Sequence, residues 1–528
     1  MNARWDIPME QKQPSVTLQA VREARRRGDL VFARSGYEQL SAGRDASWEL
    51  FVEWAEFLGG TGAAQGSVTA LREAARRFPN NPAVLNSLGL AFHGTGDYSE
   101  AVRSFETALR ATPGAGAIAY NLGNARRELG DIPGAMAAYV KALELGPPVP
   151  EMFNNLGLLF QETGDAAHAI TAYRSALGLD ASFLPAALNL GYISIQERQP
   201  ALAVAVLESA LGHHPEHPDV HWLLSHALLV MGEYARGWKE YEWRWEKMRN
   251  ATYRRKDASR QWTGEPLAGK RILLYAEQGL GDAIQCARYI PMVAAAGGVV
   301  VVECQPELVE LMRTVRGVAE VVVRGAEVPA CALECPLMSL PGVFGTTLAT
   351  VPKEVPYMVP DPAKAAVWEA WSRDGGAGRR IGVVWAGNPS HRNDMRRSLP
   401  ASYLSGLMEA GDVRWISLQK GERGDRRLEV PRGVQIEDMG ERLHDLADTA
   451  ALLMQLDLVI TVDTAVAHLA GALGRPVWVV LPYAPDWRWL LEGKGTVWYP
   501  TARLYRQPAP GNWGAVIARV VADLASLP

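Results

Sequence analysis

The sequence predicts an α-solenoid followed by an α/β module of two lobes, each a parallel sheet covered by helices. Three observations predict this fold class. A pattern repeats every 34 residues through the first half of the chain, which is typical of stacked helical hairpins. Short apolar runs alternate with helical stretches in the second half, and this alternation starts again after a glycine-rich break at 375–378. We therefore expect an array at 1–250, a first lobe at 251–375 and a second lobe at 376–528.

The length and composition are those of a globular protein with several domains. A chain of 528 residues exceeds what a single core usually supports. Its 54 basic and 58 acidic residues give a net charge of −4, so no global positive field favours nucleic acid as a partner. The sequence has no apolar stretch of about 18 residues and no basic-then-apolar leader. We therefore expect that the protein is not an integral membrane protein. The four cysteines are too few for a disulfide scaffold, so we expect a reducing, cytoplasmic location.

The repeat columns define the helical hairpins. Small residues allow two helices to approach each other, a larger residue fills the space between them, and proline ends the second helix. The columns are Gly89, Gly123, Gly157 and Gly191; Ala101, Ala135, Ala169 and Ala203; Phe105, Tyr139, Tyr173 and Leu207; and Ala108, Ala142, Ala176 and Ala210. The pattern resembles the tetratricopeptide repeat. Its register extends to about seven units, with atypical end units as caps.

An asparagine recurs on the first helix of three units, as Asn121, Asn155 and Asn189. An asparagine amide can donate to and accept from a peptide unit without reading its side chains. In the tetratricopeptide O-linked N-acetylglucosamine transferases a similar ladder holds peptide backbone, so the resemblance implies a protein or peptide partner in the groove. Asparagine is also common at this position of such repeats, and that interpretation stays open.

The second half contains two Rossmann-like lobes. Continuous apolar runs are typical of parallel strands buried on both faces. In the first lobe they lie at 271–275, 299–303 and 321–323, and a helix is expected from about Asp282 to Ala296. In the second lobe they lie at 381–385, 413–418 and 456–462, followed by a helix and a further strand at 475–482. Strand, loop, helix and strand in this order form a doubly wound lobe.

The strongest motif is Asp463-Thr464-Ala465-Val466-Ala467-His468, between a buried strand and a helix. The free N–H groups and dipole of a helix N-terminus form a site for a diphosphate. Small residues such as Thr464 and Ala465 let phosphate approach the backbone. Asp463 can cap the helix or hold a ribose hydroxyl, and His468 can reach a phosphate or a sugar hydroxyl. The simpler interpretation is an Asp N-cap with a packed histidine.

A second loop, Glu277-Gln278-Gly279-Leu280-Gly281-Asp282, follows the first strand of the first lobe. Asp282 can cap the helix that follows. The alternative of a dinucleotide fingerprint uses Gly279 and Gly281, with Glu303 as the ribose acid. The third glycine of that fingerprint is replaced by Ile284, where close packing of helix and strand requires a small residue.

Cationic residues for a departing diphosphate lie at 387–398. Arginine binds phosphate in a bidentate manner, and we favour Arg397, then Arg392, with Ser398 nearby. Gln419 ends a strand near the same cleft and is a candidate contact to the nucleotide base. The chain has no Asp-x-Asp motif, which predicts metal-independent chemistry. Cys331 with Cys335, and five histidines at 213–226, are better interpreted as buried thiols and solvated imidazoles than as metal sites.

The segment DTAVAHLAGALGRP resembles the nucleotide-sugar motif of the heptosyltransferase-like glycosyltransferases (glycosyltransferase family 9). EQGLGD resembles their N-terminal Gly-Asp loop, and similar fusions to tetratricopeptide repeats share WRW at 243–245, WAG at 385–387, SLQ at 417–419 and DWRWLL at 486–491. The resemblance implies a GT-B fold, inversion at the sugar with Asp282 as base, and a nucleotide-diphosphate sugar as co-substrate without a further cofactor.

Three functions remain open at this stage. The first is glycosyl transfer to a protein acceptor that the array recruits. Since some bacterial flagellin-modifying enzymes resemble this domain arrangement, flagellin is one candidate acceptor. A saccharide or lipid-linked acceptor, as in lipopolysaccharide assembly, is the second possibility. The third is a non-catalytic scaffold that binds proteins only. The sequence identifies neither the sugar, the nucleotide, the acceptor nor the oligomeric state.

Overall fold

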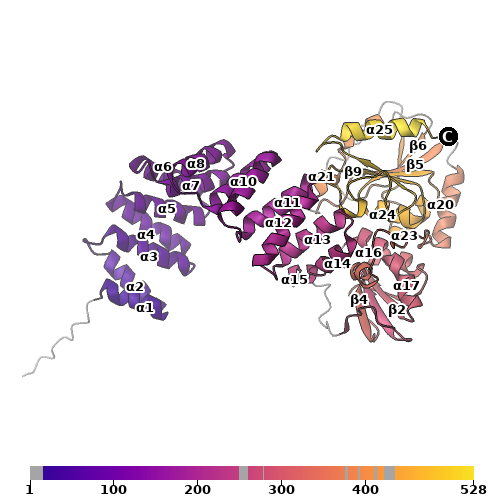
Figure 1. Ribbon diagram of the computed structural model, residues 1–528, viewed down its shortest axis with the longest axis horizontal. Helices are drawn as coiled ribbons and strands as arrows, with labels where there is room; N and C mark the ends of the chain where they lie inside the picture. Colours follow the sequence, from indigo (N-terminus) through magenta and orange to yellow (C-terminus); the bar gives the residue numbers. More distant parts are fainter. Residues whose placement is uncertain are drawn as a thin grey trace, which may run out of the picture. The chain divides into compact units, whose positions relative to one another are not determined.

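A computed structural model describes residues 16–248, 260–277, 279–374, 378–390, 393–408, 413–420 and 435–527. The chain divides into two compact units, Met1–Ala186 and Ala187–Pro528. The first unit is entirely helical where it is described, and the second holds the last helices of the array together with two parallel sheets (Figure 1). The predicted α-solenoid followed by an α/β module is confirmed.

The array consists of consecutive antiparallel helix pairs. In the first unit these helices are α1 Leu18–Arg27, α2 Leu30–Ser41, α3 Trp48–Gly60, α4 Ala64–Arg77, α5 Pro82–Gly94, α6 Tyr98–Ala111, α7 Gly116–Glu128, α8 Ile132–Leu145, α9 Pro150–Glu162 and α10 Ala166–Leu179. Then come α11 Leu184–Gln196, α12 Pro200–His213, α13 Pro218–Val230, α14 Tyr234–Tyr241 and the short α15 Arg244–Lys247. Within the described residues, α1 to α14 form seven pairs.

The glycine column lies where the two helices of a pair touch. A Cβ atom added to Gly157 on α9 would lie 2.5 Å from Cε1 of Tyr173 on α10. At Gly123 the corresponding distance, to Cδ1 of Tyr139, is also 2.5 Å. Any side chain at these positions would displace the buried ring. This contact explains why glycine recurs together with a larger residue, which is aromatic in three units and Leu207 in the fourth.

Gly157→Ala is therefore expected to lower the free energy of unfolding by about 1–3 kcal/mol, since the new methyl group overlaps the Tyr173 ring. Gly178 in α10 is the matched control, because nothing lies within 4 Å of an added Cβ atom there. Gly178→Ala should stabilise the protein by up to about 1 kcal/mol through the lower backbone entropy of the unfolded chain. Urea titration followed by circular dichroism measures both, and equal effects would contradict the packing argument.

The first sheet has four parallel strands in the order β3-β2-β1-β4. They are β1 Arg271–Tyr275, β2 Val299–Cys304, β3 Val318–Val323 and β4 Leu333–Pro336, with helices α16 Leu280–Cys286, α17 Ile290–Ala295, α18 Val309–Arg313 and α19 Leu340–Val343. The single helix expected from Asp282 to Ala296 is wrong. A 3-10 turn at Ala287–Tyr289 separates α16 from α17, and Pro291 stands in the first turn of α17, where its missing N–H costs no hydrogen bond.

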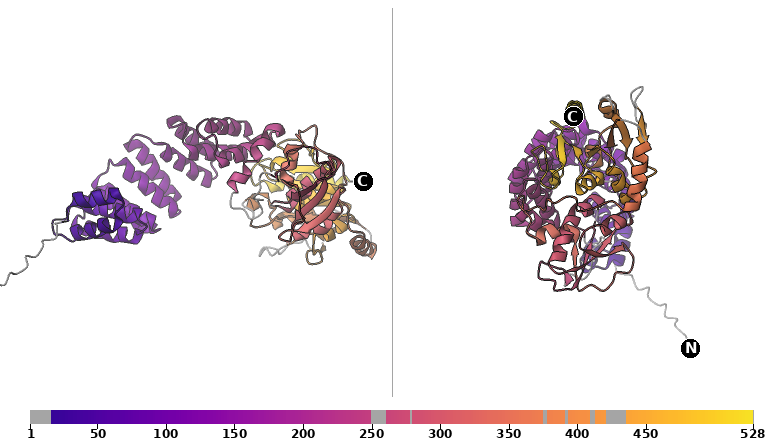
Figure 2. Two further views of the ribbon diagram at one scale, coloured as in Figure 1. Left: turned by 90° about the horizontal axis from the view of Figure 1, so that it is seen from below. Right: turned by 90° about the vertical axis from the view of Figure 1, so that its right-hand side faces the viewer.

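Among the described residues, the second sheet has six parallel strands in the order β10-β9-β8-β5-β6-β7. These strands are drawn in orange to yellow in Figure 2. They are β5 Arg379–Val384, β6 Val413–Ser417, β7 Ile436–Asp438, β8 Leu458–Val462, β9 Val477–Leu481 and β10 Ala502–Arg506. Helices α20 Pro362–Asp374, α21 Asp394–Arg397, α22 Leu404–Met408, α23 Leu446–Leu453, α24 Ala465–Ala472 and α25 Trp513–Ala525 accompany them. The strand order reverses between β5 and β8, and ligands of such sheets bind beyond the carboxyl ends of the strands at this switch point.

Buried side chains hold the two sheets and the last repeat together in the second unit. Arg288 donates to the carbonyl oxygen of Trp498 at 2.7 Å and to the Tyr357 hydroxyl at 3.1 Å. From the last helix pair, Tyr234 accepts a hydrogen bond from the Trp498 indole at 3.1 Å, and Trp238 donates to the carbonyl oxygen of Thr346 at 3.0 Å. The α13–α14 pair is thus part of the same core as the α/β module.

Within the part of the chain that the structure describes, no helix is long and apolar enough to cross a membrane. In the same residues no group of three or more His, Cys, Asp or Glu side chains could hold a metal ion. All four cysteines are buried and unbridged.

Candidate active site

Two glycines bring the Gly-Asp loop against the Asp463–His468 motif. Gly279 has a φ of +77°, and a Cβ atom there would lie 2.6 Å from Oδ2 of Asp282, so only glycine fits both the backbone and the neighbouring carboxylate. At Gly281 an added Cβ atom would lie 2.7 Å from Cδ2 of His468 and 3.6 Å from Cα of Ala465. Helix α16 therefore packs directly on the first turn of α24. Gln278 lies outside the described residues.

Asp282 lies at the start of α16 with its side chain 31% exposed. Its Oδ1 accepts a hydrogen bond from Nη2 of Arg488 at 2.7 Å. Burial raises the pKa of the carboxyl group to about 6 although the Arg488 charge lowers it. An ionised carboxylate with a raised pKa is a stronger base than a solvated one, while the exposed part of the side chain leaves room for a substrate.

Arg488 is a functional candidate that the sequence analysis did not identify. It lies in the 3-10 turn Trp487–Trp489 with its guanidinium 4.1 Å from the centroid of the Trp487 ring. Besides Asp282 it donates to Oε1 of Gln285 and Oδ1 of Asp486, both at 2.7 Å. The contacts with Gln285, Asp486 and the Trp487 ring fix the orientation of the guanidinium, which in turn orients the Asp282 carboxylate. The only signal in the sequence was the DWRWLL segment.

Helix α24 presents its N-terminus next to Asp463. Thr464 occupies the N-cap but makes no side-chain hydrogen bond to the helix; its hydroxyl lies 3.0 Å from that of Thr461. The N–H groups of the first turn, from Ala465 on, thus lack the usual side-chain cap and suit an anion. Burial, with the nearby Asp486 charge, raises the pKa of Asp463 to about 6.

The segment after β5 places Arg397 beside this helix. Its Nη1 donates to the carbonyl oxygen of Asp463 at 3.2 Å. An added Cβ atom on Gly387 would lie 2.5 Å from Nη2 of Arg397, so the backbone of that loop runs close to the guanidinium. The predicted arginine and the predicted helix N-terminus therefore meet. Arg392 lies outside the described residues.

Ser398 and Gln419 have partners within the protein. The Ser398 hydroxyl accepts from the N–H of Gly387 at 3.2 Å and donates to Oδ1 of Asp394 at 3.0 Å. The Gln419 side-chain oxygen accepts from the N–H of Ala386 at 3.0 Å, and its amide nitrogen donates to the carbonyl oxygen of Ala386, also at 3.0 Å. These contacts shape the loop after β5. They favour positioning roles over the direct donor contacts expected for both residues.

His468 is buried on α24. Its Nδ1 lies 2.9 Å from the Tyr499 hydroxyl, and its ring is stacked on that of Trp489 at 5.3 Å between centroids. Burial lowers the pKa of the imidazole to about 3, so it is neutral at physiological pH. This environment favours the packed histidine of the simpler interpretation, with His468 holding α24 against α16.

A buried ion pair connects the Gly-Asp loop to the end of the array. Its arginine, Arg244, was not identified as a site residue in the sequence analysis. Arg244 in α15 is fully buried and donates Nε and Nη2 to the two carboxylate oxygens of Glu277 at 2.8 and 2.7 Å. It also donates to Glu242 and to the Ser339 hydroxyl, each at 2.7 Å. The WRW segment therefore positions the residue that opens the loop of Asp282.

The asparagine ladder makes contacts between repeats. In the first unit, Asn121 donates to Oδ1 of Asn86 at 3.0 Å, and Asn155 donates to Oδ1 of Asn124 at 2.9 Å. Both lie on first helices of their pairs and are partly buried. Asn189 lies at the equivalent position of α11, in the second unit. The amides of Asn121 and Asn155 thus link adjacent repeats, whatever they bind in the groove.

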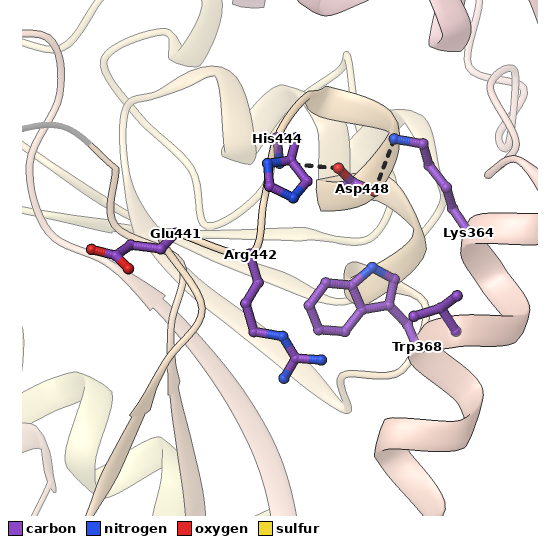
Figure 3. Close-up of a pocket in the computed structure, with 7 residues that line it drawn as sticks. Lys364, Trp368, Glu441, Arg442, His444 and Asp448 are labelled. Carbon is purple, nitrogen blue, oxygen red and sulfur yellow. Dashed lines mark hydrogen bonds and ion pairs between the residues drawn. The ribbon is translucent and has the colours of Figure 1, made fainter.

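A separate cavity of about 470 Å³ lies between α20 and the loop before α23 (Figure 3). Its cations are already engaged. Lys364 donates to Asp445 and pairs with Asp448, both at 2.8 Å, and the Arg442 guanidinium lies 4.8 Å from the Trp368 ring centroid. None of the predicted site residues that the structure describes lines this cavity.

Comparison with family models identifies the class of protein. Residues 58–116, 94–150, 120–183 and 194–237 match models of the tetratricopeptide repeat. Residues 443–483, which include β8, α24 and the Asp463–His468 motif, match the model of glycosyltransferase family 9 (heptosyltransferase). The chain therefore joins tetratricopeptide repeats to an α/β module in which one segment is similar to glycosyltransferase family 9.

Among characterised proteins, the chain is similar to Protein FlbA of Caulobacter vibrioides. The two are 27% identical over 325 residues, which cover 56% of this chain and 53% of FlbA. The chain thus spans about half the length of the curated relative that it matches. Solved structures are similar to part of the chain. A tetratricopeptide repeat protein from Parabacteroides merdae is 14% identical (TM-score 0.36, 45% of this chain, 93% of that chain). MamA from Desulfovibrio magneticus is 20% identical (TM-score 0.30, 32% and 96%).

Proposed function

We propose that the protein is an inverting glycosyltransferase of the GT-B type, which transfers a sugar from a nucleotide-diphosphate sugar to an acceptor hydroxyl. One observation carries the proposal. Asp282, with a raised pKa and a partly exposed carboxylate, stands on a helix that packs against the uncapped N-terminus of α24. A base and an anion site are thereby adjacent at the carboxyl ends of β1 and β8.

In the proposed reaction the acceptor oxygen attacks the anomeric carbon while the bond from that carbon to the diphosphate breaks. Asp282 receives the acceptor's proton as the new bond forms. The departing diphosphate carries the charge, which the N–H groups of α24 and the Arg397 guanidinium stabilise. Arg488 orients Asp282 through the hydrogen bond of 2.7 Å. We propose no role for a metal ion or a further cofactor in this step.

Nucleotide binding tests the proposal most directly. A nucleotide at about 100 times its Kd should stabilise the folded protein by about 2.7 kcal/mol. We expect one of UDP, GDP, ADP or CMP to raise Tm, and we expect Arg397→Met to abolish the shift. Arg442→Met is the matched control, because Arg442 is an arginine of the same lobe that lines the other cavity. No shift with any nucleotide would favour a non-catalytic scaffold, and loss of the shift only in Arg442→Met would move the site to that cavity.

For the acceptor we propose a protein or peptide bound by the array, because seven helix pairs offer far more recognition surface than a small acceptor needs. Flagellin is one candidate. A saccharide or lipid-linked acceptor is the alternative, and sugar transfer to an added glycan but to no polypeptide of the cell extract would favour it.

The pH dependence of catalysis should report the carboxyl groups of the site. Asp282 acts as base only when ionised, and its pKa is raised to about 6, so kcat/KM should fall as pH decreases through 6, by about tenfold per unit below it. Protonation of Asp463, which has a similar pKa, would steepen the decrease. Initial rates between about pH 4.5 and about pH 8 measure the profile. A rate that stays constant down to the lowest pH would contradict the assignment of the base.

A further inference from the structure

The turn inside each helix pair contains one residue with positive φ, and in one pair this residue is not glycine. Gly28, Gly62, Gly96, Gly130, Gly164 and Gly232 have φ between +76° and +82°. At the equivalent position of the sixth pair, between α11 and α12, the residue is Arg198 with a φ of +57°. A non-glycine residue in this region is strained, and such strain persists where surrounding contacts compensate for it.

The side chain of Arg198 supplies such contacts. Its Nη2 donates to the carbonyl oxygen of Leu491 at 2.9 Å and to Oε1 of Glu492 at 2.5 Å. The guanidinium also lies 5.4 Å from the centroid of the Tyr483 ring. All of these partners belong to the segment 483–492 that follows β9. Arg198 therefore joins the sixth repeat to the segment that contains Arg488.

The segment that Arg198 holds is itself strained. Leu490 has a φ of +56°, so the chain turns sharply directly after the 3-10 turn of Arg488. In addition, Nη2 of Arg506 donates to the carbonyl oxygens of Trp489 at 2.7 Å and Glu492 at 3.1 Å. Two arginines thus bind backbone carbonyl groups on both sides of the unfavourable Leu490 conformation.

The same turn of the array reaches the other half of the site. Oε1 of Gln196, two residues before Arg198, accepts a hydrogen bond from Nη1 of Arg396 at 2.6 Å. Arg396 precedes Arg397 in α21. A single turn of the sixth repeat thus contacts the two segments that carry Arg488 and Arg397.

From these contacts we infer that Arg198 is a positioning residue for the active site. It holds the segment 486–492 in the conformation in which Arg488 orients Asp282. The sixth repeat is then part of the catalytic scaffold as well as of the acceptor-binding array. This inference rests on the proposed glycosyl transfer, but the contact itself can be tested without any substrate.

The test is Arg198→Gly in the full chain, which places at this position the glycine found in the six equivalent turns. Loss of the contacts and relief of the backbone strain oppose each other, so Tm should change little. Amide hydrogen exchange in 486–492 should become faster, because the carbonyl group of Leu491 loses its partner. We expect kcat to fall by about tenfold to a hundredfold through misplacement of Arg488, with KM for the nucleotide sugar unchanged.

Two further variants separate the parts of the contact. Glu492 is 88% exposed, so Glu492→Gln removes a solvated ion pair and should change kcat by less than about twofold. Arg198→Lys keeps the charge but loses the planar guanidinium that lies near the Tyr483 ring, and it should lower kcat as Arg198→Gly does. If Arg198→Gly raises Tm while exchange in 486–492 and kcat stay at wild-type values, Arg198 only ends a helix and the inference is wrong.

The same experiment distinguishes failure of the inference from failure of the proposed function. If wild-type protein neither binds a nucleotide nor transfers sugar, but exchange in 486–492 still depends on Arg198, the contact is real and the catalytic assignment is wrong. If wild-type protein is active and Arg198→Gly is fully active with unchanged exchange, the positioning role is wrong and the transferase remains.

Discussion

Asp282→Asn is expected to lower kcat by about 10²–10⁴-fold, the usual contribution of a general base. The amide has the size of the carboxylate, and its oxygen can still accept the hydrogen bond that Arg488 donates at 2.7 Å. The site should therefore keep its shape and lose only its proton acceptor. Release of the nucleoside diphosphate measures turnover, and the Tm shift with the nucleotide should equal that of the wild type.

The matched control is Asp523→Asn. Asp523 is a carboxylate of nearly the same exposure, 30% against 31%, and it is paired with Arg503 and the Tyr505 hydroxyl near the C-terminus. Loss of this ion pair should leave kcat unchanged. If Asp282→Asn turned over at the wild-type rate, Asp282 would be a helix cap and the base would be another group of the site.

Arg244→Ala is expected to lower the free energy of unfolding by about 3–5 kcal/mol, the usual effect of removing one partner of a buried ion pair. Glu277, only 5% exposed, would keep a buried carboxylate without the two hydrogen bonds that Arg244 donates. Because Glu277 opens the loop that ends in Asp282, activity should fall as well. Urea titration gives the free energy, and initial rates are measured well below the denaturation midpoint.

The double variant Arg244→Met with Glu277→Leu distinguishes the ion pair from general packing. Replacing both charges by apolar side chains should recover most of the stability, since no buried charge is left without a partner. Recovery of stability without recovery of activity would show that the pair positions the loop. A single variant as stable as the wild type would contradict the assigned burial of Arg244.

The elements that were predictable from the sequence depend on contacts that recur or lie close along the chain. Gly157 and Tyr173 belong to one helix pair, so their contact produces a column that recurs in four successive repeats. The strands are buried on both faces and therefore read as continuous apolar runs. Asp282 and Asp463 each follow such a run, and the carboxyl ends of parallel strands are where ligands bind.

Other parts of the site were not predictable. Arg488 lies 206 residues after Asp282, and Arg244 lies 33 residues before Glu277. Neither contact leaves a periodic signal, and an arginine between tryptophans has the same local pattern whether it fills a core or orients a base. The role of Arg198 was not predictable for the same reason. The repeat pattern predicts the turn between α11 and α12, but it does not predict which segment this turn contacts.

The sequence by itself determined the repeat array, the order of the two α/β lobes and the segments that carry the candidate base and the anion site. Those features follow from local periodicity and from the backbone geometry of strand ends. Only the tertiary structure decided which side chains remain available to a substrate. His468 and Gln419 suit donor binding by residue type, yet Nδ1 of His468 faces the Tyr499 hydroxyl and the Gln419 amide bonds to the backbone of Ala386. Burial and hydrogen bonding between segments distant in sequence decide the role of a polar group, and these are fixed only when the chain packs.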